Sequence, residues 1–180
     1  MENELIKYYA AYLPYGVKVQ DCLYPETEWT LHYYRDALDT LADNEHISLF
    51  QLLKENETDT HKLKLRPLSD ITNDIEHDDF SFIPIVYLLK EATRQIWGEE
   101  IVLIEKPEIH CYNESAGIIA YNDTERVSLT VDVTDIRKEF ELRIDGGQMM
   151  LDQVKLFNKL FEWHFDVFGL IEKGLAVPLT

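Results

Sequence analysis

The chain has 180 residues, of which 46% are hydrophobic and 12% aromatic, and its formal net charge at pH 7 is −17. This apolar and aromatic content is too high for a disordered chain, and the length suits a single domain over residues 1–180. Lys and Arg form no cluster of the kind that binds phosphate backbones, so the composition argues against direct binding of nucleic acid.

Several sequence features bear on the compartment of the protein. The first residues include Glu2, Glu4 and Lys7, and they lack the basic flank and apolar centre of a signal peptide. No apolar run approaches the about 20 residues that span a bilayer. Cys22 and Cys111 lie far apart and outside any C-x-x-C pair, which favours a reducing compartment. We therefore expect a cytoplasmic protein without membrane contact.

The first third of the chain is predicted to contain one short helix followed by strands. Residues 4–12 have the apolar spacing of an amphipathic helix, ended by Pro14 and Gly16. Branched and aromatic residues then predict strands at 17–20, 29–34, 47–53 and 61–65. Residues 35–43 fit either a helical turn or a polar connection, and residues 54–60 form the best candidate for a loop tip.

Two helices are predicted next. Ser69 can cap a short helix, with Asp70 near its positive end. A longer helix is predicted over residues 83–97, because apolar residues recur at helical spacing after Pro84 and Gly98 follows as a stop.

The rest of the chain is predicted to form a meander and a final helix. Strand patterns occur at 101–104, 109–112, 117–121, 126–133 and 139–144, separated by turn signals at 113–115, 122–124 and 145–147. An apolar stripe from 150 to 168, with Gly169 as its cap, predicts a C-terminal amphipathic helix. Strands that are close in sequence pair antiparallel, so we expect an α+β fold of antiparallel sheets packed by a few helices.

Three stretches of the chain together resemble a known family. They are YLPYGVK at 12–18, ISLF at 47–50 leading to LRPLSDIT at 65–72, and HFDVFGLI at 164–171 with GLA at 174–176. In order and position they resemble a large group of uncharacterised proteins encoded by phages and integrated elements of gut anaerobes. The resemblance implies a mobile-element protein of the bacterial cytoplasm and supplies no catalytic residue. Its Leu, Pro, Gly and Phe residues are of the kind that a fold requires, so we interpret them first as structural.

Two groups of residues could hold a metal ion or a nucleophile. His110 and Cys111 are neighbours, but adjacent strand residues point to opposite faces, so we favour a core or partly exposed pair over a Cys-His site. Glu76-His77-Asp78-Asp79 could bind a divalent cation, but it lacks the glycine and the alternating spacing of a calcium loop. A solvated polar turn is the favoured interpretation.

Three further places have a functional and a structural interpretation. Asp145-Gly146-Gly147-Gln148 precedes the last predicted helix and could bind phosphate, although a hairpin or helix-entry turn is favoured. His164 and Asp166 do not share a helix face, so we expect His164 to pack at the apolar stripe and Asp166 to face solvent. Arg66 could contact an acidic partner, but a hydrogen bond to a neighbouring loop is favoured. We therefore assign no catalytic, cofactor-binding or metal-binding residue.

The sequence leaves three functions open. The leading hypothesis is a non-enzymatic accessory protein of a phage or integrated mobile element, acting through protein–protein contacts. An alternative is an acidic DNA mimic that occupies a nucleic-acid-binding host protein. A small hydrolase or nuclease is the third, because distant residues can assemble a site in space. The apolar face of the final helix suits either a core or a homo-oligomer.

Overall fold

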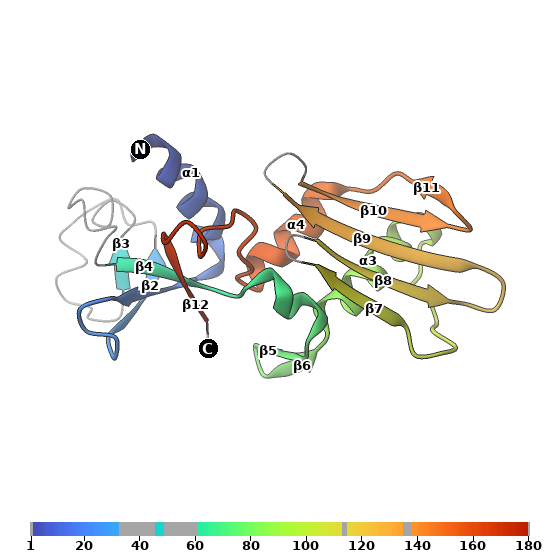
Figure 1. Ribbon diagram of the computed structural model, residues 1–180, viewed down its shortest axis with the longest axis horizontal. Helices are drawn as coiled ribbons and strands as arrows, with labels where there is room; N and C mark the ends of the chain where they lie inside the picture. Colours follow the sequence, from blue (N-terminus) through green and yellow to red (C-terminus); the bar gives the residue numbers. More distant parts are fainter. Residues whose placement is uncertain (1, 33–45, 49–60, 113–114, 135–137, 180) are drawn as a thin grey trace. The chain divides into compact units, whose positions relative to one another are not determined.

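The computed structural model describes residues 2–32, 46–48, 61–112, 115–134 and 138–179 (Figure 1). The fold is α+β, as predicted, with largely antiparallel sheets and helices that include a C-terminal one. We expected one domain over residues 1–180, and the contacts divide the chain into two compact units. The first comprises Met1–Pro67 and Phe161–Thr180, and the second comprises Leu68–Leu160.

The first unit contains a five-stranded sheet and a helix. Helix α1 (Glu2–Tyr12) is followed by a 3-10 turn (Leu13–Tyr15) that ends at Gly16 with a φ of 61°. The sheet has the order β12-β4-β1-β2-β3. Its strands are β1 (Lys18–Asp21), β2 (Glu28–His32), β3 (His46–Ser48), β4 (His61–Leu65) and β12 (Ala176–Pro178). Strand β1 pairs antiparallel with β2 and β4, whereas β12 and β3 join the sheet edges in parallel.

The core of the first unit follows from alternation in the strands. In β1 and β4 every second side chain is buried, so that Val19 and Leu63, which pair across the strands, lie on the same face. Tyr9 and Tyr12, one helical turn apart, bring α1 onto this face. The buried cluster consists of Tyr9, Tyr12, Val17, Val19, Leu31, Leu63, Leu65, Leu170 and Ala176.

The second unit is built on an antiparallel meander. Its sheet has the order β11-β10-β9-β8-β7, in which every neighbouring pair is antiparallel. The strands are β7 (Glu108–Tyr112), β8 (Ser115–Tyr121), β9 (Arg126–Val133), β10 (Lys138–Ile144) and β11 (Gly147–Met149). Before them come a 3-10 helix, η4 (Leu68–Thr72), and a small hairpin of β5 (Ile75–His77) and β6 (Phe80–Phe82).

Helices cover one face of this meander. Helix α3 (Pro84–Trp97) packs against β8 and β9 (Figure 1). Helix α4 (Gln153–Glu162) is tied to β10, because the Gln153 side chain bonds both backbone groups of Phe140 and the rings of Phe140 and Phe157 lie 4.9 Å apart. A buried Glu91 on α3 pairs with Lys155 on α4 at 2.7 Å. The opposite face of the sheet is therefore the one left to solvent.

Two element predictions were wrong. The final helix was expected to continue to residue 168, but α4 ends at Glu162, and His164 has a φ of 61°. The chain leaves the helix there because backbone pairing with Arg66 replaces helical bonds: the Arg66 amide donates to His164 and the Asp166 amide donates to Arg66. Residues 101–104 form no strand, since the Ile101 amide instead donates to Thr93 Oγ1 on α3.

Other predictions agree with the structure or fall outside it. Strands β1, β2, β4, β7, β8, β9 and β10 and helix α3 lie where the sequence placed them. The 3-10 helix η4 also forms, but it begins at Leu68, so the expected cap Ser69 lies inside it. The short strands β5, β6, β11 and β12 were missed. The expected connection at 35–43 and loop tip at 54–60 lie outside the described residues, as does most of the strand predicted at 47–53. Within the described part of the chain, no helix is long and apolar enough to cross a membrane.

Candidate functional site

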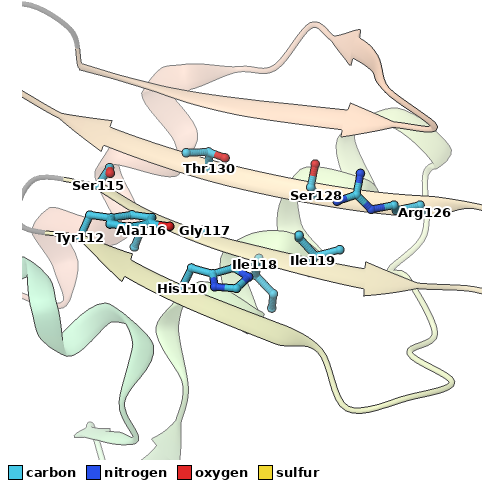
Figure 2. A pocket seen from close by; sticks show the side chains of 10 residues that line it. All are labelled: His110, Tyr112, Ser115, Ala116, Gly117, Ile118, Ile119, Arg126, Ser128 and Thr130. Atoms are coloured by element: carbon cyan, nitrogen blue, oxygen red, sulfur yellow. The ribbon is translucent and has the colours of Figure 1, made fainter.

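The solvent face of the second sheet contains a hollow centred on the strand β8. Alternation buries Ala116, Ile118 and Ala120 toward the helices, so their neighbours in β8 face outward. Strand register then places His110 of β7 and Thr130 of β9 on either side of Gly117. Because Gly117 has no side chain, the three strands leave an open hollow of about 220 Å³. Figure 2 shows it lined by His110, Tyr112, Ser115, Ala116, Gly117, Ile118, Ile119, Arg126, Ser128 and Thr130.

Neither packing nor backbone geometry requires glycine at position 117. Its φ lies outside the left-handed region, and the pairing of β8 with both neighbours continues past it without a bulge. A Cβ there would lie 3.6 Å from the Leu129 carbonyl oxygen and 3.7 Å from Thr130 Oγ1, which are ordinary contacts. Glycine weakens a strand interior and is often found where another molecule approaches the backbone. The residue therefore points to the hollow as a place of contact.

The lining of the hollow differs in charge from the chain as a whole. Acidic residues number 34 of 180, yet none is among the lining residues, which instead include His110 and Arg126. The backbone of Arg126 is held at the start of β9 by two hydrogen bonds to Asp145, each 2.9 Å long. In the described part of the chain no hydrogen bond or ion pair engages its guanidinium. A charged donor is thus available at one end of the hollow.

The chemical groups of the hollow suit recognition of a side chain. Hydroxyls of Ser115, Ser128 and Thr130 supply donors and acceptors, and Ile119 supplies an apolar floor. Tyr112 stands at the rim with 69% of its surface exposed. Tyr and Arg are the residue types that contribute most to the energy of protein interfaces. The arrangement can therefore hold an inserted side chain by hydrogen bonds and apolar contact together.

The pair His110 and Cys111 separates as strand geometry predicts. His110 faces the hollow, and its Nε2 lies 4.0 Å from Glu108 Oε2. The Sγ of Cys111 instead lies 3.9 Å from the carbonyl oxygen of Ser69 in η4. No hydrogen bond joins the His110 ring to a hydroxyl of the described residues. The two side chains are therefore not parts of one site.

The other acidic and glycine-rich candidates form hairpin turns. Asp78 and Asp79, with φ values of 48° and 66°, connect β5 to β6. Asp145 and Gly146, with φ values of 48° and 86°, connect β10 to β11, so this stretch precedes a strand and not directly a helix. Positive φ at both central positions is typical of type I′ hairpins. In the ranges that the structure describes, no three His, Cys, Asp or Glu side chains gather as a group of possible metal ligands.

Arg66, His164 and Asp166 come together in the first unit through backbone and buried contacts. His164 Nε2 lies 2.9 Å from the carbonyl oxygen of Tyr15. Asp166 was expected in solvent, but it is only 6% exposed. Its two carboxylate oxygens accept hydrogen bonds of 2.8 Å from the amides of Leu170 and Ile171. The prediction failed because α4 ends before Asp166. The carboxylate of Asp166 instead accepts hydrogen bonds from backbone amides of the segment that follows.

Tyr12 lies at the centre of the same contacts. Its hydroxyl donates to the Phe165 carbonyl oxygen at 2.7 Å and accepts from the Val167 amide at 3.3 Å. Burial raises the pKa of Tyr12 well above its usual value of 10, and the Asp166 carboxylate raises it further, while the Val167 hydrogen bond lowers it. Parts of the stretches at 12–18, 65–72 and 164–171 thus meet in one packed cluster.

Of the residues that line the hollow, sequence reasoning singled out His110 alone, and as part of a pair with Cys111. Strand patterns predicted β8 and β9, but no motif marks residues that become neighbours only through strand register. The available signal was Gly117 itself, a glycine beside the branched and aromatic residues of a predicted strand. A search among known proteins finds no matching family model, no matching curated protein and no matching solved structure.

Proposed function

We propose that this protein is a non-enzymatic accessory protein that acts through protein–protein contacts, and that the outer face of β7, β8 and β9 is its binding surface. The hollow at Gly117 is the observation that carries the proposal. A partner side chain that enters it meets the hydroxyls of Ser128 and Thr130 and the guanidinium of Arg126. The glycine keeps the hollow open at a cost in strand stability.

The character of the rim supports a protein partner. An exposed Tyr112 and Arg126, whose guanidinium has no ion pair among the described residues, flank the hollow, and interfaces depend on a few such anchors surrounded by weaker contacts. No acidic side chain lines the hollow itself, although Glu108, Asp132 and Glu141 lie beside it, paired in register with Ile119, Ser115 and Thr130.

The setting of the proposed contact follows from the family resemblance. The stretches at 12–18, 65–72 and 164–171 resemble proteins of phages and integrated elements, so we place the protein in the bacterial cytoplasm. Its partner would then be a protein of the host or of the same element.

The test fills the hollow and leaves the fold intact. Gly117→Val adds a side chain that suits a strand and occupies the hollow. Gln148→Val adds the same side chain at an exposed position of β11, away from the lining. Each variant is immobilised and exposed to lysate of the source bacterium, and circular dichroism confirms its fold.

We expect the wild type and Gln148→Val to retain one stoichiometric protein. Gly117→Val should bind that protein at least about tenfold more weakly, a loss of about 1.4 kcal/mol. Equal retention by all three proteins would refute the proposed surface. Failure of the wild type to retain any stoichiometric protein would count against the function itself.

A further inference from the structure

Strand β7 lies at one edge of the sheet in the second unit (Figure 1). It pairs with β8 over all five of its residues without a bulge, and no strand among the described residues pairs with its other edge. The other edge strands that the structure describes, β3, β5, β6, β11 and β12, have three residues each. Short strands, prolines, lysines and bulges are the devices that keep a sheet edge from pairing with another chain. The longer β7, with the sequence EIHCY, has none of them.

The helix-covered side of β7 is incompletely buried. Strand register places Ile109 beside Ile118 and Cys111 beside Ala116. The two β8 side chains are at most 1% exposed, whereas Ile109 is half-buried and Cys111 is exposed. The apolar layer beneath the sheet therefore ends short at this edge. A further strand beside β7 would complete it and remove apolar surface from water.

A second copy of β7 matches the helix-covered side of the first. Antiparallel pairing centred on His110 is the register that opposes all five residues of one strand to all five of the other. Because paired residues in this register lie on the same side of the sheet, the helices of both copies cover one side. Each Ile109 then meets the Cys111 of the second copy, so that both incompletely buried side chains gain an apolar neighbour.

The outer face of β7 is self-complementary in the same register. Each Glu108 is opposed to the Tyr112 of the second copy and lies diagonal to its His110, within reach of a cross-strand contact. The two Glu108 carboxylates lie at opposite ends of the pair, so no like-charged carboxylates are opposed. The net charge of −17 on each chain repels the copies, but salt at physiological strength screens this repulsion beyond about 8 Å.

We infer that two copies of this chain associate by antiparallel pairing of β7 with β7, with the two-fold axis at His110. Any extended strand can bond to the backbone of this edge, but a second copy also matches both of its faces, and two-fold pairs are the commonest assemblies of identical chains. The two five-stranded sheets then continue as one, and both hollows open on its outer face. The inference goes beyond the proposed function and does not depend on what enters the hollow.

Engineered disulfides test the pairing and its register. In a full-length chain with Cys22→Ser and Cys111→Ser, His110→Cys should give a disulfide-linked dimer under mild oxidation. Opposed residues of antiparallel strands have Cα atoms about 4.5–5.5 Å apart, which is within the range of a disulfide. Glu108→Cys is the matched control, because it is exposed on the same face of the same strand, yet its two copies would lie roughly 13 Å apart along the strands. Equal crosslinking of the two variants would indicate random collision and overturn the inference.

Sedimentation equilibrium of the full-length chain measures the association without a crosslink. We expect the wild type to form a dimer. Cys111→Lys, at a position already exposed in the single chain, should weaken the dimer about tenfold or more, because the ammonium group would lose water beside the Ile109 of the second copy. Cys111→Ser should weaken it less.

Gly117→Val separates this inference from the proposed binding surface, since it should dimerise like the wild type even where it no longer binds the partner of the hollow. Circular dichroism confirms the fold of each variant. A wild type that stays monomeric at every concentration, or a dimer that Cys111→Lys leaves unchanged, would overturn the pairing through β7.

Discussion

The hydroxyl of Tyr12 lies 2.7 Å from the carbonyl oxygen of Phe165, to which it donates a hydrogen bond. The Tyr12 hydroxyl oxygen also accepts a hydrogen bond from the Val167 amide at 3.3 Å, so the buried phenol acts as both donor and acceptor inside the core. The Tyr12 ring meets Phe161 and Phe168 edge-on, at centroid distances of 5.3 and 6.2 Å. One side chain thus joins the end of α1 to a segment near the other end of the chain.

We expect Tyr12→Phe to destabilise the protein by about 0.5–1.5 kcal/mol, measured as the free energy of unfolding in urea. The ring is retained, and the Val167 amide still donates to the Phe165 carbonyl oxygen at 2.9 Å, but both groups lose the phenol hydroxyl. Tyr24→Phe is the control, since its hydroxyl lies on an exposed side chain and its loss should change stability by less than about 0.5 kcal/mol. Equal effects of the two substitutions would contradict the role given to Tyr12.

Stability should fall in alkali because of two buried tyrosines. Burial raises the pKa of Tyr9 from 10 to about 12, and the pKa of Tyr12 is raised as well. Above pH 10 the unfolded chain releases these protons while the folded chain keeps them. The free energy of unfolding therefore decreases as the pH rises. The contribution is complete below pH 10 and is lost as pH rises toward 12, by at most about 1.4 kcal/mol per pH unit for each group.

Urea unfolding of the wild type and Tyr9→Phe across this alkaline range isolates one of the two groups. Tyr9→Phe should show a shallower decline of stability above pH 10, because phenylalanine has no proton to lose. Parallel curves for the two proteins would show that Tyr9 ionises equally in both states.

Asp166→Asn should destabilise the first unit by about 1–3 kcal/mol. Both carboxylate oxygens accept backbone amides, from Leu170 and Ile171, and asparagine offers only one acceptor oxygen and turns an NH₂ group toward the other amide. Hydrogen exchange at these two amides should accelerate. The pKa of Tyr12 should move toward its usual value, since the carboxylate beside it is gone. Glu172→Gln, at an exposed position in the same segment, should cause none of these three changes.

Local patterns predicted the elements whose ends are set locally. The strands predicted at 61–65 and 126–133 coincide with β4 and β9, because alternating burial is written directly into alternating residue type. Helix α3 was placed well because Pro84 and Gly98 mark its ends, and Gly98 has the left-handed φ of 79° expected of a cap.

Features set by distant partners were not predictable in the same way. The apolar spacing continues past α4 through Phe165, which is buried, so the sequence alone extends the helix. What ends the helix is backbone pairing with Arg66, which no local pattern records. The hollow was missed for a related reason: Gly117 was taken as the first residue of a strand, where glycine is unremarkable, but β8 begins at Ser115 and places it inside.

Replacing glycine by alanine at two positions separates a glycine needed by the fold from one that keeps the hollow open. Gly16 has a φ of 61°, where alanine is strained, so Gly16→Ala should destabilise the protein by about 1–2 kcal/mol. Gly117→Ala should stabilise it by about 0.5–1 kcal/mol, because the new methyl group makes ordinary contacts and the unfolded chain loses freedom. Urea unfolding measures both changes. If Gly117→Ala were destabilising like Gly16→Ala, the fold would require this glycine, and the hollow would be a consequence of packing and not a surface kept open for a partner.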